Sequence, residues 1–269
     1  MISLDWKERL KKDTIDFYER KLPNHDYDID IVYNVYPERV DNKVPAPVIT
    51  LVGKTLASKL AKDADKYFPF YDYLLSHKGE SGVMIFVYIM ARAIKRHPDV
   101  FFEYLEKVLF SLQDQKTCNL IFDKAIYPYL KEHPEKYLDT LLSWLKRDNL
   151  YVTKGLQKIF TKLINYKPEL IKPIFNKLET SWLYATPRMI KFNSQFIKAI
   201  YTVDTDYYLS IYNTYKSTRN PIFAEILCNA IVCYDGNIET MVDTWAHSGN
   251  VKLKKIGLHG QKIIKRRKK

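Results

Sequence analysis

Apolar residues recur every three or four positions over most of this chain, a spacing typical of amphipathic helices. One clear run consists of Val152, Leu156, Ile159, Phe160 and Leu163. Polar turns that carry Pro or Gly interrupt this spacing at regular intervals. The pattern therefore predicts a series of helices joined by short turns.

One landmark recurs five times along the chain: a polar turn followed by an apolar helical run. A clear copy is KRHPDVFFEYLEKVLF, which starts at Lys95. The equivalent positions, spaced by 36, 34, 37 and 31 residues, are Pro98, Pro134, Pro168, Thr205 and Gly236. Periods in this range are typical of stacked helix pairs. We therefore predict an all-α fold, a right-handed α-α superhelix (solenoid) of HEAT-like helix pairs.

Each landmark helix is followed by a second helix with its own start signal. The residues that precede these apolar runs include Asn149, Thr186, Asn220 and Asn250. Side chains of these types accept hydrogen bonds from the free N–H groups at a helix start. Second helices are expected over 83–97, 116–132, 152–167, 187–201, 219–234 and 250–264. First helices are expected over 98–110, 134–147, 168–179, 204–216 and 236–247.

The N-terminal third is less regular. Residues 6–22 and 45–61 have helical spacing, whereas the alternation within Pro23–Tyr36 fits either a short strand or an ordered loop. No Gly- or Ser-rich linker divides the chain. We therefore predict a single HEAT-like domain over 1–269, with an irregular cap (1–78), helix-pair repeats (79–264) and a basic tail (265–269).

Composition places the chain among globular proteins, at 46% hydrophobic and 28% charged residues. Its 43 Lys and Arg against 31 Asp and Glu give a net charge of +12. Nine of the basic residues lie within Lys252–Lys269, a stretch without acids, and the other 251 residues carry a net charge of only +3. Taken alone, this partition fits a nearly neutral globule with a solvated basic end.

Charge also divides between the two kinds of helix. The expected first helices hold 11 acids and 7 bases, whereas the expected second helices hold 3 acids and 18 bases. Because stacked pairs place all second helices in one row, their surface is expected to attract a polyanion. The expected phosphate contacts are Lys154, Lys158, Lys162, Arg188, Lys191, Lys252 and Lys255. A nucleic acid is the favoured partner; an acidic protein segment and an uninvolved solvated face are the alternatives.

Most catalytic motifs are absent from the sequence. Val52–Thr55 (VGKT) resembles the end of a phosphate-binding loop, but Val48 stands where the first glycine belongs. The six histidines form no metal-binding pair, and the three cysteines form no CxxC pair, which fits a reducing compartment. The apolar stretch Gly82–Ala91 is too short to span a bilayer. We expect a cytoplasmic monomer without membrane contact, metal or cofactor.

Three segments resemble the HEAT-like bacterial DNA alkylation repair family, the alkylpurine DNA glycosylases. They are KVPAPVITLVGKTLASKLAKD, GESGVMIFVYIMARAIKRHP and TCNLIFDKAIYPYLKEHPEKYLDTLLSWLKRDNLYVTKGLQKIF. The similarity covers roughly residues 40–260, and its motifs are loose. It implies a HEAT-like fold and, for the family's enzymes, excision of alkylated purines from DNA.

The resemblance also implies roles for individual residues. Asp123 matches the acid that stabilises the positive charge developing on the sugar, and Lys154 matches a phosphate-contacting Arg. Asn119 stands where the family has a tryptophan, and a later aromatic position falls near Gln195 or Phe196, so Asn119 and Phe196 are expected to line the cleft. From the residues alone, Asp123 could equally be a surface acid paired with Lys124 or Lys116.

Two functions therefore follow from the sequence. The first is a protein that holds the phosphates of duplex DNA on a basic concave surface and, as an enzyme, excises alkylated purines. The second is a non-catalytic helical-repeat scaffold that binds an acidic protein partner.

Overall fold

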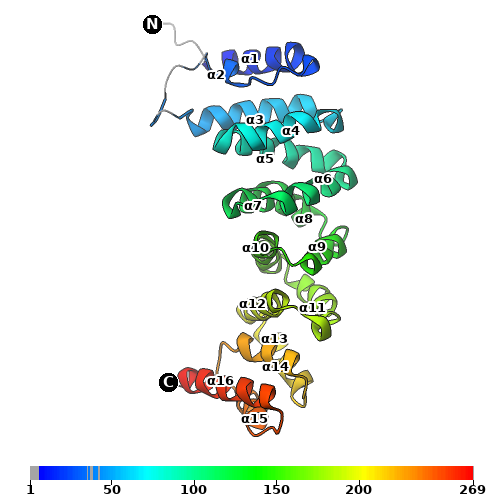
Figure 1. Ribbon diagram of the computed structural model, residues 1–269, viewed down its shortest axis with the longest axis vertical. Helices are drawn as coiled ribbons and strands as arrows, with labels where there is room; N and C mark the ends of the chain where they lie inside the picture. The colour runs from blue at the N-terminus through cyan, green and yellow to red at the C-terminus, as the bar shows by residue number, and fades with distance from the viewer. Residues whose placement is uncertain (1–5, 35, 37–38, 42, 269) are drawn as a thin grey trace. The chain divides into compact units, whose positions relative to one another are not determined.

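A computed structural model describes residues 6–34, 36, 39–41 and 43–268 (Figure 1). The fold is all-α: the described residues form no strand, and the one β-type pairing among them is an isolated bridge between Val40 and Lys43. The chain divides into two compact units, Met1–Glu132 and His133–Lys269, here called the N-terminal and C-terminal units. Each unit is described by itself.

The N-terminal unit is built around two long helices that lie side by side, α3 (Ala46–Leu60) and α5 (Gly79–Arg96). α1 packs on α3, and α4 packs on α5. The other helices of this unit are α1 (Trp6–Arg20), α2 (Asp30–Tyr33), α4 (Phe68–His77), α6 (Pro98–Ser111), α7 (Gln115–Ile121) and α8 (Tyr127–Glu132). Within the expected cap, α1 and α3 confirm the helices predicted over 6–22 and 45–61, and α2 and α4 are two further helices.

The described part of residues 23–36 is not fully an ordered loop, one of the two predicted structures, and the other prediction, a short strand, is wrong. A 3-10 turn (Leu22–Asn24) and the short helix α2 occupy it. The buried side chains are Ile29, Val32 and Tyr33, whereas Ile31 is 47% exposed. The apolar residues that matter for packing are therefore spaced three and four apart, and the alternation at every second residue is coincidental.

A π-helical segment, Phe122–Ile126, joins α7 to α8. The N–H of Tyr127 donates to the carbonyl of Phe122, five residues back. Pro128 follows directly, and it has no N–H to continue the α-helical ladder. The wider turn lets the helix continue past this proline, an arrangement typical of single-turn π-bulges.

The C-terminal unit contains successive helix pairs. Its first helices are α9 (Leu138–Trp144), α11 (Ile171–Glu179), α13 (Thr205–Tyr215) and α15 (Gly236–Ala246). Its second helices are α10 (Leu150–Tyr166), α12 (Pro187–Val203), α14 (Pro221–Ala230) and α16 (Val251–Arg267). The second helices pack in chain order, α10 on α12, α12 on α14 and α14 on α16. This confirms the predicted helix pairs; the right-handed superhelix stays a prediction.

The helix starts follow the expected capping chemistry. The side chain of Asn149 accepts hydrogen bonds from the N–H groups of Tyr151 and Val152, at 2.9 and 3.0 Å. Thr186, Asn220 and Asn250 cap α12, α14 and α16 in the same way. These four capping predictions are confirmed, and they fix where each second helix begins.

Large aromatic side chains fill the interior of the pairs. Trp144, Trp182 and Trp245 are at most 1% exposed. At the last pair, Gly257 lies against the backbone of α15, where a Cβ would overlap Ala246. This close approach fixes α16 on α15. α16 runs to Arg267, so most of the expected basic tail is helical, and Lys269 lies outside the described residues.

Candidate nucleic-acid interface

Two neighbouring second helices of the C-terminal unit, α10 and α12, carry basic side chains on their outer faces. They pack against each other, partly through an edge-to-face contact between Phe160 and Phe192 with ring centroids 6.1 Å apart. Each helix has 17 residues, and neither contains an Asp or Glu. Two adjacent helices without a single acid concentrate positive potential on one surface.

On α10 the basic residues are Lys154, Lys158 and Lys162, and all three are exposed. Their spacing of four residues places them on one side, about 6 Å apart along the helix axis. The buried residues of α10, such as Leu156 and Leu163, occupy the opposite side. Among the described residues, no acid pairs with Lys154.

On α12 the exposed Lys191 and the half-buried Lys198 lie on the outer side, seven residues or about two turns apart. Among the acids that the structure describes, none pairs with either lysine. Lys198 was not among the expected phosphate contacts. Its spacing of seven residues from Lys191, about two helical turns, could have predicted its place on the same side of α12. We call Lys154, Lys158, Lys162, Lys191 and Lys198 the basic face.

Arg188 differs from these lysines because it is tied to a turn. Its guanidinium lies 3.3 Å from the carboxylate of Asp148 and also donates a hydrogen bond to the backbone carbonyl of Asp148. Asp148 has a positive φ of 51° at the end of the preceding 3-10 turn. Arg188 thus holds the turn before α10 against the start of α12, and its charge is partly neutralised there.

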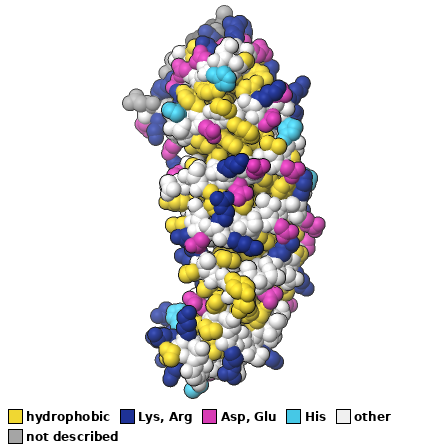
Figure 2. Space-filling view, turned by 45° about the vertical axis from the view of Figure 1, so that its right-hand side comes forward, with side chains coloured by type: hydrophobic (Ala, Val, Ile, Leu, Met, Phe, Trp, Pro, Cys, Tyr) yellow, Lys and Arg dark blue, Asp and Glu magenta, His cyan; other side chains and the backbone are white. Residues whose placement is uncertain are grey.

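The next second helix interrupts the row of bases. α14 contains Glu225 and no Lys or Arg. Beyond it, Lys252 and Lys255 are exposed on α16, together with Lys262 and Arg266. Figure 2 shows Lys and Arg side chains gathered toward the lower left of the view, near the C-terminal helix. The seven expected contacts therefore form two groups, one on α10 and α12 and one on α16.

The candidate acid Asp123 lies in the N-terminal unit, within the π-helical segment, and its side chain is half-buried. Asn119 is one turn earlier, and its side-chain oxygen accepts a hydrogen bond from Gln115 at 3.0 Å. Lys116 forms an ion pair with Glu80. The hydrogen bond from Lys116 lowers the pKa of the Glu80 carboxyl. Lys116 thus has an acid partner in Glu80, and the pairing of Asp123 with Lys124 or Lys116 stays a prediction.

Phe196 does not have the expected place in a cleft. Its side chain is 0% exposed, on the buried side of α12. The neighbouring Gln195 is the exposed residue of the two. An aromatic surface for nucleotide bases is therefore not supplied by Phe196.

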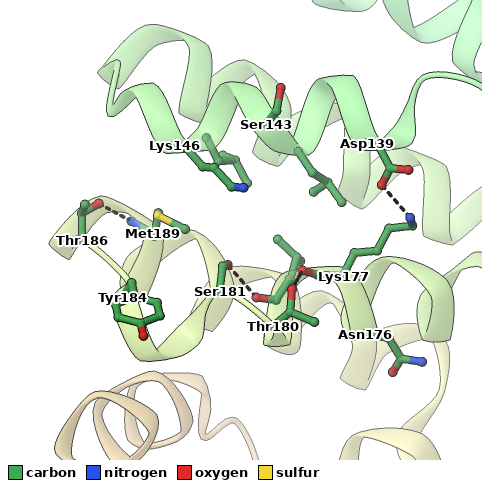
Figure 3. A pocket seen from close by; sticks show the side chains of 13 residues that line it. Asp139, Ser143, Lys146, Asn176, Lys177, Thr180, Ser181, Tyr184, Thr186 and Met189 are labelled. Atoms are coloured by element: carbon green, nitrogen blue, oxygen red, sulfur yellow. Dashed lines mark hydrogen bonds and ion pairs between the residues drawn. The ribbon is translucent and has the colours of Figure 1, made fainter.

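A cavity of about 740 Å³ lies on the other side of the C-terminal unit, between α9, α11 and the start of α12 (Figure 3). Lys177 donates to Asp139 at 2.5 Å across this cavity. Tyr184 borders it and is 82% exposed. None of the residues expected from the sequence lines this cavity.

Several polar groups of this cavity form hydrogen bonds within the protein. The hydroxyls of Thr180 and Ser181 donate to backbone carbonyls one turn back, both at 2.8 Å. Thr186 caps α12 by accepting from the N–H of Met189 (Figure 3). The lining includes no His or Cys, and its one acid is paired with Lys177. The cavity therefore lacks a nucleophile with an adjacent base.

The cysteine thiols and the possible metal ligands do not form a further reactive site among the described residues. Burial raises the pKa of the Cys118 and Cys228 thiols to about 12, which makes both thiols unreactive at neutral pH. Within the described part of the chain, no group of three His, Cys, Asp or Glu is arranged to hold a metal ion. None of the described helices has the length and apolar character needed to cross a bilayer.

Comparisons with family models, with curated proteins and with solved structures found no match to this chain. The resemblance to the alkylpurine DNA glycosylases therefore stays a prediction from the sequence. The fold and the basic face are the findings on which a function can be argued.

Proposed function

We propose that this protein binds the phosphate backbone of duplex DNA through the basic face of α10 and α12. One observation carries the proposal: two packed helices of 17 residues each present outward lysines and contain no acid. Each lysine that neutralises a phosphate releases condensed counterions, and this release drives binding. Long, flexible lysine side chains suit contact with phosphates, and phosphate contacts position the duplex without reading its sequence.

The lysine spacing supports a backbone contact. Lys154, Lys158 and Lys162 extend about 12 Å along α10, and α12 lies about 10 Å away as a packed neighbour. The basic face therefore covers a patch that several consecutive phosphates can reach. Lys252 and Lys255 on α16 form a second group beyond α14 and are proposed as further contacts.

The direct test is binding of a fluorescently labelled duplex by the full chain, measured by anisotropy at physiological salt. A generic acidic polymer, poly-glutamate, serves as competitor. Preferential binding of the duplex supports the proposal. Equal affinity for poly-glutamate and duplex would contradict it and favour the scaffold that binds an acidic protein segment.

We further propose that Asp123 acts in excision of alkylated purines, as the resemblance implies. The support is its place in a π-helical turn, a feature frequent at functional sites, and its partial exposure. A carboxylate there would stabilise positive charge on the sugar as the base leaves. The test is release of methylated purines from alkylated duplex DNA by the wild type and by Asp123→Asn. Release by neither protein, or by both equally, would remove Asp123 from this role.

The scaffold alternative has its own supporting observation, the exposed Tyr184 beside the cavity of Figure 3. Exposed aromatic residues next to a hollow are common in protein-binding surfaces. Tyr184→Ala should leave duplex binding unchanged if the basic face is the DNA contact. Loss of a protein partner in this variant, with DNA binding absent from the wild type, would favour the alternative.

A further inference from the structure

A second basic site lies in the N-terminal unit, where α3 and α5 run side by side. Gly53 permits their close approach, because a Cβ there would lie 2.8 Å from Cδ2 of Tyr88. Further along, the facing residues are Ala57 and Ala91, which are too small to fill the space between the helices. The result is a groove of about 580 Å³, here called the α3–α5 groove.

Four cations line the α3–α5 groove: Lys54 from α3 and Arg92, Lys95 and Arg96 from α5. No acid is among the lining residues. Lys95 is neutralised by Glu132, with 2.6 Å between Nζ and the carboxylate. Arg92 and Arg96 have no described acid within ion-pair distance, and the Lys54 ammonium lies 5.9 Å from the ring centroid of Tyr88.

Helix stability alone does not account for this arrangement. Lys95 and Arg96 stand in the last turn of α5, where cations favourably meet the negative end of the helix dipole. Arg92 lies one turn earlier, and Lys54 belongs to the middle of α3. Like charges gathered around one hollow repel each other, and a bound anion would remove that repulsion.

We propose that the α3–α5 groove binds a small anion with two linked phosphates, such as a nucleoside diphosphate. The guanidinium groups of Arg92 and Arg96 would take phosphate oxygens in pairs, and Lys54 would add a third positive charge. Tyr88 offers an aromatic side for a ligand ring. The volume lies within the ordinary range of small-molecule sites, about 300–1,000 Å³.

This site does not use a phosphate-binding loop. Val52–Thr55 lies inside helix α3, so its backbone N–H groups are engaged in the helix and cannot cradle a phosphate. Lys54 acts instead through its side chain. The site is also independent of the DNA proposal, because all of its residues belong to the N-terminal unit and the basic face belongs to the C-terminal unit.

The test is isothermal titration calorimetry of the full chain with ADP and with inorganic pyrophosphate, at physiological salt. We expect one saturable site for each ligand. Arg92→Gln/Arg96→Gln should weaken binding at least about tenfold. Ala91→Leu should weaken it as well, by filling the groove without changing any charge. Lys11→Gln/Lys12→Gln, two exposed residues of α1, removes the same charge elsewhere and should leave binding unchanged.

The outcomes decide between a specific site and general charge. Failure of the wild type to bind either ligand would overturn the proposal. So would equal weakening by the α1 control, or unchanged binding by Ala91→Leu with its fold confirmed by circular dichroism. If Arg92→Gln/Arg96→Gln lowers affinity for duplex DNA while ADP does not bind the wild type, the groove belongs to a nucleic-acid surface and the proposal is refuted.

Discussion

Replacing Lys154, Lys158 and Lys162 together by glutamine should flatten the salt dependence of duplex binding. The logarithm of the binding constant falls with the logarithm of salt concentration by about 0.9 for each phosphate neutralised. If the five lysines of the basic face each meet one phosphate, the slope is about −4.5 for the wild type and about −1.8 for the variant.

These slopes give a large difference in a simple titration. Between about 50 and 200 mM salt, the wild type should lose about 500-fold in affinity and the triple variant only about 12-fold. Fluorescence anisotropy with a labelled duplex at four or more salt concentrations measures both slopes. The three side chains are exposed, so the variant should keep the wild-type helix content and melting temperature.

A matched control separates local contact from total charge. Lys136→Gln/Lys172→Gln/Lys216→Gln removes three exposed charges from the first-helix side of the same unit. Both triple variants lower the net charge from +12 by three. Equal slopes in the two variants, or a wild-type slope in the α10 variant, would refute the reasoning.

Three further predictions follow from the fold. Gly257→Ala should lower the free energy of unfolding by about 2–3 kcal/mol, because the new Cβ overlaps the backbone of α15. Gly249→Ala, in open space, should change the free energy of unfolding little, and urea denaturation measures both variants. Hydrogen bonds from the side chain of Thr117 and from backbone N–H groups hold the pKa of the Asp114 carboxyl below its usual 3.8. The ionised carboxylate therefore stabilises the fold fully above pH 3.8, and this stabilisation is lost as the pH falls through the lowered pKa. Asp114→Asn should therefore make the free energy of unfolding less dependent on pH between about pH 5 and pH 2, and a steeper dependence would contradict this. Of the three thiols, the half-exposed Cys233 should react with a disulfide reagent before the two buried thiols in the native state, although burial raises its pKa too. All three should react in denaturant, and equally fast labelling of two or more native thiols would contradict this order.

The helix pairs could be predicted because their signals are local. Asn149, Thr186, Asn220 and Asn250 mark helix starts by a hydrogen bond within three residues, and the structure contains all four bonds. Local signals also identified the outward lysines of α10, since a spacing of four residues is enough to place side chains on one side of a helix.

Features that depend on a partner helix could not be predicted in this way. Arg188 was expected to face a phosphate, but Asp148, which is 40 residues earlier, holds it. Phe196 was expected near a surface, and packing of α12 against its neighbours buries it. The α3–α5 groove depends on small residues meeting across two helices, which no single stretch of sequence displays.

The π-helical segment has a consequence for how this chain can be aligned with other helical proteins. A π-turn contains one residue more than an α-turn. Each residue after Ile126 therefore points in the direction that the preceding residue would have in an uninterrupted α-helix. An alignment that counts residues at α-helical spacing through Phe122 therefore matches different faces before and after it. Equivalence for Asp123 has to be assigned by the direction of its side chain in space, and a one-residue deletion in this turn would rotate α8 relative to α7.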